Sequence, residues 1–305
     1  QLQGCYTGID FLSRLAGGES IPTGRSAVII GGGNTAIDCT RNLIRLGVKE
    51  VNLVYRRTRN EMPANPVEIE AAEAEGVKFR FLAAPVRVVG NEEGVTTHLE
   101  YLTMELGEPD ASGRRRPVPI EGSESLIETD MVITAIGQAP DISFIETMQQ
   151  QLAELKTTRW NTFEVDPATL QSTIPYLFAA GDAATGPSLV VDAIGGGRRA
   201  ARSIHQFVLG QPVVADPLEL QKDLISETLF DQVLGVVKTQ RAPMPELPVA
   251  ERIQSFIEAD QVLSEQAALG ESSRCLNCCL TCYNPDKASG EIGVIKDLSR
   301  ETEVA

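Results

Sequence analysis

Three adjacent glycines near the start of the chain have the spacing of a phosphate-binding turn. The run Gly31–Ala36 reads GGGNTA, fits the pattern G-x-G-x-x-A, and stands between an apolar run, residues 27–30, and a helical pattern. In this context one glycine permits the tight turn, another lets a pyrophosphate approach the backbone, and the alanine lets helix and sheet pack closely. Free N–H groups at the helix start would then bind the phosphates, with an ordinary structural turn as the alternative. The residues expected to hold a dinucleotide are Gly31, Gly33, Asn34, Thr35 and Ala36.

The end of the next apolar run, residues 51–55, indicates which dinucleotide binds. An NAD site places an acidic residue there to hold the ribose 2′-hydroxyl, whereas this chain has Arg56 and Arg57. Planar guanidinium groups suit a 2′-phosphate because they can donate two parallel hydrogen bonds to it. We therefore expect Arg56 and Arg57 to bind the 2′-phosphate of NADPH, with a solvated basic loop as the alternative. The run Arg114–Arg116 is expected to be only a solvated turn.

Four of the six cysteines lie close together near the end of the chain, in the pattern C-x2-C-C-x2-C. They are Cys275, Cys278, Cys279 and Cys282. Four thiolates suit a [4Fe–4S] cluster, although two adjacent cysteines on one cluster would strain the loop. Zinc, a redox-active pair and no metal at all are the alternatives. Such local clustering differs from a disulfide framework and indicates a reducing compartment, so we expect the cytoplasm.

Two further motifs have the features of a flavin site. Residues 134–140, which include Gly137, follow one predicted strand, and Gly181 and Asp182 follow another. A carboxylate after a strand can accept hydrogen bonds from the ribityl hydroxyls of a flavin. The helix expected after Gly195–Gly197 could point its N-terminus at the flavin ring and stabilise the reduced anion. The glycines would allow the close backbone approach that this requires.

These residues need a particular set of elements to hold them. A strand over 27–30, a helix from Asn34 and a strand over 51–55 form a βαβ unit. Further along we expect a helix over 67–74, strands over 77–82, 131–136 and 176–180, and hairpin strands within 85–129. The predicted fold is α/β: a Rossmann-like NAD(P)-binding domain, the C-terminal part of an FAD-binding domain, and a small helical cysteine-rich tail. The expected divisions are a connection from the flavin half over 1–24, the NAD(P)-binding domain over 25–130, the FAD-binding part over 131–210 and the tail over 211–305.

The composition narrows the choice of partners. The chain has 305 residues and a formal net charge of −15, so it would repel the phosphates of nucleic acid. No apolar run approaches the roughly 18 residues of a membrane helix, and we expect no membrane insertion. Cys39, which falls in the helix after the glycine turn, is expected to be a packing residue.

Taken together, these motifs resemble the glutamate synthase small (beta) subunit family of NADPH-dependent FAD oxidoreductases. The similarity covers about residues 5–210 and is carried by the glycine run, Tyr55–Ala64 with its Met-Pro-Ala, and the motifs ending at Gly137 and Asp182. It implies hydride transfer between NADPH and FAD, with electrons passing through iron–sulfur clusters to a partner subunit. It also implies that Gly181 and Asp182 line the FAD, with Ala193 and Ile194 near its ring.

The chain departs from that family upstream of Gly31. Family members begin with cluster-binding cysteines and a first glycine turn for the FAD adenosine, and residues 1–30 contain neither. We therefore expect an FAD site that is only partly present, completed by the missing N-terminal half or by an electron-accepting partner subunit. One alternative is a disulfide reductase like thioredoxin reductase, although residues 24–130 contain only Cys39. Another is a non-enzymatic nucleotide-binding subunit.

Overall fold

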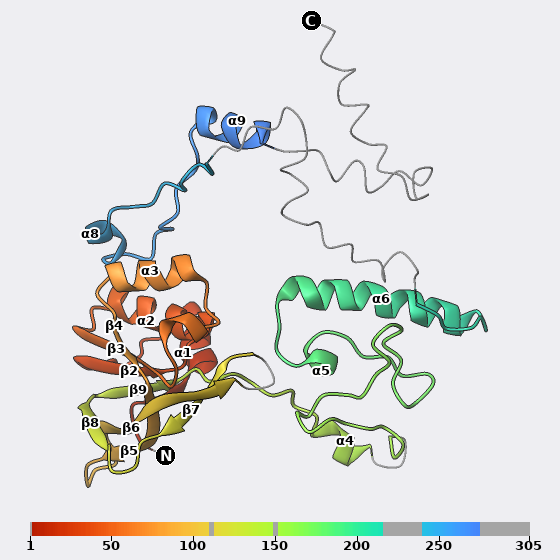
Figure 1. Cartoon of the computed structure of the whole chain (residues 1–305), viewed down its shortest axis with the longest axis horizontal. Helices are drawn as coiled ribbons and strands as arrows, with labels where there is room; N and C mark the ends of the chain where they lie inside the picture. The colour runs from red at the N-terminus through yellow and green to blue at the C-terminus, as the bar shows by residue number, and fades with distance from the viewer. Residues whose placement is uncertain (1, 110–112, 149–151, 216–239, 275–305) are drawn as a thin grey trace, which may run out of the picture. The chain divides into compact units, whose positions relative to one another are not determined.

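The computed structural model describes residues 2–109, 113–148, 152–215 and 240–274 (Figure 1). The chain divides into two compact units. The first comprises Gln1–Gln221 together with Val249–Phe256, and the second comprises Lys222–Pro248 and Ile257–Ala305. Within the described residues, no helix is both long enough and apolar enough to cross a membrane.

A five-stranded parallel sheet in the order β1-β9-β2-β3-β4 forms the centre of the first unit. Its strands are β1 (Cys5–Thr7), β2 (Ser26–Ile30), β3 (Glu50–Tyr55), β4 (Lys78–Phe81) and β9 (Met131–Thr134). The apolar runs predicted as strands are buried on both faces, as expected for a covered parallel sheet. The edge strand β1 was not predicted, because three residues are too few to show a periodic pattern.

The two faces of this sheet carry different layers (Figure 1). Helices α1 (Gly8–Ala16), α2 (Asn34–Arg45) and α3 (Pro66–Ala74) cover one face. Because successive strand residues point to opposite faces, Ile29 packs with the helices whereas its neighbour Val28 packs on the other side. The sheet therefore separates two hydrophobic clusters.

The second layer is antiparallel and consists of β5 (Ala83–Gly90), β6 (Thr96–Pro109), β7 (Arg115–Pro119) and β8 (Ser125–Glu128). The hairpin strands predicted within 85–129 are thus confirmed. The expectation that Arg115 and Arg116 form a solvated turn is corrected. Both residues belong to β7, which pairs with β6. Leu99 and Ile127 of this layer pack against the parallel sheet.

In the described residues of 141–215 the structure has the helices α4 (Phe144–Thr147), α5 (Asp182–Thr185) and α6 (Val190–Val208). The strand predicted over 176–180 is wrong, since only a single bridge, Gln171 to Phe178, forms there. A strand requires hydrogen-bonded neighbours along its length, and an apolar run alone does not supply them. The expected start of the following helix is also corrected, because Gly195–Gly197 lie inside α6.

The tail holds α8 (Val249–Arg252) in the first unit and α9 (Glu265–Ser273) in the second. Within the second unit, Glu246 forms an antiparallel bridge with Asp260. The four tail cysteines lie outside the described residues. The expected domain divisions remain a prediction.

Candidate functional site

A cavity of about 990 Å³ lies where four strands of the parallel sheet end. Its wall is built by residues that follow the carboxyl ends of β1, β2, β3 and β9. In open parallel sheets this edge is where ligands bind, because loops of several strands converge there. Of the residues predicted from the sequence, Gly31, Gly33, Thr35, Arg56, Arg57 and Gly137 line this cavity.

The three glycines at the end of β2 are required for different reasons. Gly31 has φ +145°, and a Cβ atom there would lie 2.3 Å from the carbonyl oxygen of Ala135. A Cβ at Gly32 would lie 2.5 Å from the ring of Tyr55. At Gly33 a Cβ would meet nothing within 4 Å. Gly31 and Gly32 therefore serve the fold, whereas Gly33 leaves open space that a pyrophosphate can use.

The N-terminus of α2 faces the same space. Gly33 is its N-cap and makes no side-chain capping bond, so the first N–H groups of the helix remain available for an anion. Thr35 lines the cavity, whereas Ala36 is fully buried and lets α2 pack on the sheet. Asn34 supports the wall, because its Oδ1 accepts from the amide of Asn65 at 2.9 Å.

The two arginines after β3 differ in their surroundings, although both line the cavity. Arg56 is exposed, whereas Arg57 is only 4% exposed and donates from Nε to the carbonyl oxygen of Arg115 at 2.8 Å. The next turn is closed by a capping box in which Glu61 accepts from Thr58. The hydrogen bond from the Thr58 hydroxyl lowers the pKa of Glu61, so this carboxylate stays charged and holds the turn.

Sequence reasoning missed several lining residues. Thr7, Gly8 and Ile9 follow the short strand β1, and Arg114 precedes β7. Gly8 is closely packed, since a Cβ there would lie 2.9 Å from the Cγ2 of Thr35. No local pattern could reveal these residues, because strand pairing brings them to the glycine turn from distant parts of the sequence.

Of the residues predicted to bind flavin, Gly181, Asp182, Ala193 and Ile194 come together around α5 and α6, whereas Gly137 lines the cavity of the glycine turn. Gly181, with φ +61°, is the N-cap of α5, and a Cβ there would lie 3.1 Å from the Cβ of Ala193. Asp182 is exposed, and its Oδ1 accepts from the amide of Ser188 at 3.3 Å. Ile194 is 68% exposed. The exposed carboxylate of Asp182 therefore lies next to the close approach of Gly181 to Ala193. A carboxylate placed in this way can accept hydrogen bonds from a ligand that bears hydroxyl groups.

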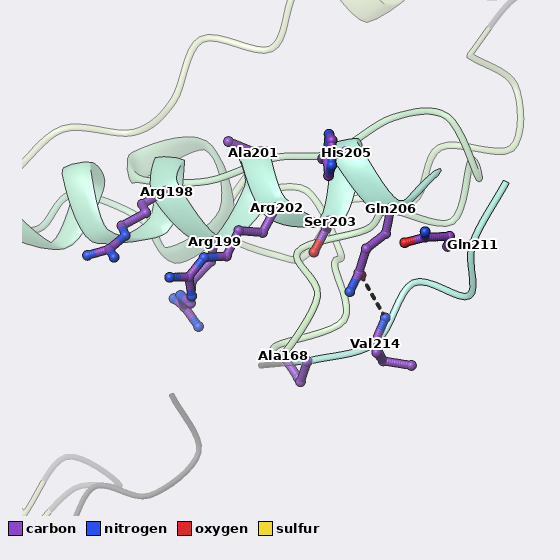
Figure 2. Close-up of a pocket in the computed structure, with 11 residues that line it drawn as sticks. Ala168, Arg198, Arg199, Ala201, Arg202, Ser203, His205, Gln206, Gln211 and Val214 are labelled. Carbon is purple, nitrogen blue, oxygen red and sulfur yellow. Dashed lines mark hydrogen bonds between the residues drawn. The ribbon is translucent and has the colours of Figure 1, made fainter. Parts of the chain in front are cut away.

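Another cavity, of about 630 Å³, runs along a different part of α6 (Figure 2). Basic side chains line it, and Figure 2 shows Gln206 reaching the amide of Val214, which donates to it at 3.0 Å. The basic residues are Arg198, Arg199, Arg202 and His205. None of the residues predicted as ligand-binding lines this cavity.

Cys39 is the cysteine that follows the glycine turn. Cys39 is fully buried, and burial followed by the nearby charge of Asp38 raises the pKa of its thiol to about 12. Such a thiol is inert as a nucleophile. No group of three or more potential metal ligands occurs in the part of the chain that the structure describes, and Cys275, Cys278, Cys279 and Cys282 lie outside it.

The chain is similar to several known proteins whose names include NADP(H). The chain is 39% identical over 259 residues to the "NADP(+)-dependent formate dehydrogenase subunit beta" of Moorella thermoacetica, covering 84% of this chain and 36% of that protein. It is 41% identical over 201 residues to the "Glutamate synthase [NADPH] small chain" of Azospirillum brasilense, covering 65% and 40%. The structure of Mycobacterium tuberculosis FprA in complex with NADPH matches with a TM-score of 0.52 at 17% identity, covering 69% of this chain and 60% of that one.

These comparisons bear on the expected family and fold. The chain spans less than half the length of the two curated relatives. The likeness to FprA concerns the fold and agrees with the predicted Rossmann-like architecture of a two-dinucleotide flavoprotein. The resemblance to the glutamate synthase small-subunit family is confirmed. Residues 3–197 match the model of the pyridine nucleotide-disulphide oxidoreductases, and the chain belongs to that family.

Proposed function

We propose that this chain is the NADPH-binding module of an NADPH:acceptor oxidoreductase that passes hydride between NADPH and FAD. One observation carries the proposal: an uncapped helix N-terminus, an open glycine position and two arginines line a single cavity. The helix end and Gly33 suit a pyrophosphate. Arg56 and Arg57, at the end of β3, suit the additional phosphate that distinguishes NADPH from NADH.

The flavin segment would contribute the second half of the reaction. Bound FAD would supply the ring that exchanges hydride with the nicotinamide. Asp182 would accept hydrogen bonds from the ribityl hydroxyls, and Gly181, Ala193 and Ile194 would lie against the flavin. The FAD phosphates would need a further glycine turn, which another chain segment or a partner subunit would supply.

Electrons would leave through the tail cysteines to an electron-accepting partner subunit. Two findings support this step: four thiols lie within one short segment, and a relative is named as a beta subunit. A [4Fe–4S] cluster is the group proposed for Cys275, Cys278, Cys279 and Cys282. Anaerobic reconstitution followed by iron and sulfide analysis tests it. Stoichiometric iron and sulfide are expected, and stoichiometric zinc or the absence of metal would contradict the cluster.

The coenzyme assignment is tested by calorimetric titration of the chain with 2′,5′-ADP and with 5′-AMP. These fragments share the adenosine and the single 5′-phosphate and differ only in the 2′-phosphate. The wild-type chain should bind 2′,5′-ADP more tightly, and Arg56→Ala should remove about 1.5–3 kcal/mol of that preference. Equal affinity of the wild-type chain for both fragments would overturn the NADPH assignment.

A further inference from the structure

We infer that the β6–β7 hairpin is part of the coenzyme site, with Arg114 donating to the 2′-phosphate and Arg57 positioning it. The inference rests on the proposed NADPH site and adds a specificity residue to it. Its starting point is that Arg114 lines the same cavity as Arg56 and the glycines Gly31–Gly33. The sequence alone indicates nothing of this, because Arg114 lies next to a strand of the antiparallel sheet and far along the chain from the glycine turn.

Hydrogen bonds tie the hairpin to the end of β3. The buried guanidinium of Arg57 donates from Nε to the carbonyl oxygen of Arg115, the residue after Arg114, at 2.8 Å. The carbonyl oxygen of Arg57 accepts from the amide of Leu82 at 3.0 Å, and that of Leu82 accepts from the amide of Met104 in β6 at 2.7 Å. Both strands of the hairpin are therefore held beside the residues that follow β3.

The three consecutive arginines have different roles in this arrangement. Arg115 donates to the carbonyl oxygens of Leu106 at 2.6 Å and Gly107 at 3.2 Å, so its side chain binds the neighbouring strand β6. Arg116 is exposed and does not line the cavity. Arg114 is the member of this run that lines the cavity.

The chemistry of the ligand favours a third guanidinium. A 2′-phosphate carries up to two negative charges and three acceptor oxygens, and Arg57 already donates its Nε to the carbonyl of Arg115, so a donor beyond Arg56 and Arg57 is favoured. The chain as a whole has a net charge of −15 and would otherwise repel this group. Arg56 follows a strand of the parallel sheet and Arg114 precedes a strand of the antiparallel sheet, and both line the cavity, so they can approach the phosphate from different segments.

Substitution of Arg114 with a matched control tests the inference. Arg114→Ala should weaken binding of 2′,5′-ADP about tenfold and leave 5′-AMP binding unchanged, because the two ligands differ only in the 2′-phosphate. Arg116→Ala removes the same charge from the same strand region and should alter neither affinity. If Arg114→Ala leaves 2′,5′-ADP binding unchanged, or if Arg116→Ala weakens it equally, the role of Arg114 is refuted. A wild-type chain without preference would instead refute the NADPH assignment itself.

The positioning role of Arg57 is tested by measuring 2′,5′-ADP binding in single and double variants. Arg57→Lys keeps the charge but removes the planar donor that holds the Arg115 carbonyl. If Arg57 acts through Arg114, Arg57→Lys should weaken 2′,5′-ADP binding less in an Arg114→Ala background than in the wild-type chain. Additive losses in the double variant would show that Arg57 does not position Arg114.

Discussion

The carboxylate of Glu75, at the C-terminal end of α3, forms a buried ion pair with Arg252 of α8. The Nε of Arg252 lies 3.0 Å from Oε1 of Glu75, and the two side chains are 5% and 0% exposed. Arg41 and Arg45 of α2 also bind this carboxylate, at 2.8 and 2.9 Å. The segment Val249–Phe256 is thereby attached to the helical layer that covers the parallel sheet.

Arg252→Ala should detach α8 without unfolding the domain. Arg41 and Arg45 would still pair with Glu75, so most of the cluster would survive. The amides of Ile253 and Gln254, which donate to the carbonyl oxygens of Val249 and Glu251 in α8, should lose protection in hydrogen exchange measured by mass spectrometry. Glu251→Ala, in the same helix, is the matched control and should leave exchange unchanged. Equal exchange in Arg252→Ala and in the wild-type chain would contradict this anchoring role.

Glu75→Gln should be far more damaging than removal of one arginine. The substitution leaves three guanidinium groups around an uncharged side chain, and breaking a buried ion pair in this way costs about 3–5 kcal/mol. Glu73→Gln is the control on the same helix, because Glu73 pairs with Arg59 at the surface, where such pairs contribute about 0–1 kcal/mol. Urea denaturation of both variants measures the difference. A loss of less than 1 kcal/mol in Glu75→Gln would contradict it.

The same carboxylate should make stability depend on pH in the acid range. Burial raises the pKa of Glu75, but hydrogen bonds from Arg41 and Arg45 outweigh it and the pKa lies below its usual 4.5. Because the folded-state pKa is depressed, this stabilisation is complete above pH 4.5 and is lost as the pH falls through the folded value. Denaturation midpoints between pH 7 and pH 3.5 should fall more steeply for the wild-type chain than for Glu75→Gln. Parallel curves would show that Glu75 is not the titrating group.

The sequence predicted best what depends on neighbouring residues. The glycine turn, the helix after it and the buried strands follow from spacing over a few residues, and the structure has them. Alternation of side chains along β2 likewise determines which residues face each cluster.

Features that depend on pairing between distant segments were not predictable in the same way. Arg114 lines the cavity and Arg57 binds the carbonyl of the adjacent Arg115, and the residues next to Arg57 or Arg114 in the sequence do not indicate that contact. Arg252 pairs with Glu75 although the two residues are far apart in the sequence. The strand expected over 176–180 failed for a related reason, since apolar composition does not supply the neighbours that a strand needs.

Alanine substitutions at two positions of the glycine turn should have different effects, one on the stability of the fold and the other on ligand binding. Gly31→Ala should destabilise the domain, because its φ of +145° and the Ala135 carbonyl oxygen leave no room for a Cβ. Gly33→Ala should keep the domain folded, since a Cβ there meets open space, but it should weaken binding of NADP+ by obstructing the pyrophosphate position. Thermal denaturation and calorimetric titration of both variants provide the comparison. Normal binding by a folded Gly33→Ala chain would mean that the phosphates lie elsewhere.

Cys39 distinguishes hydride transfer through flavin from disulfide chemistry in the nucleotide domain. Its thiol is fully buried, donates to the carbonyl oxygen of Gly8 at 3.8 Å, and has a pKa raised to about 12. At pH 8 roughly one thiol in ten thousand would be the reactive thiolate. We therefore expect iodoacetamide to leave Cys39 unmodified in the native chain at pH 8 and to alkylate it fully in denaturant, as measured by peptide mass spectrometry. Rapid native alkylation, or recovery of Cys39 in a mixed disulfide, would contradict the packing role and support a disulfide reductase.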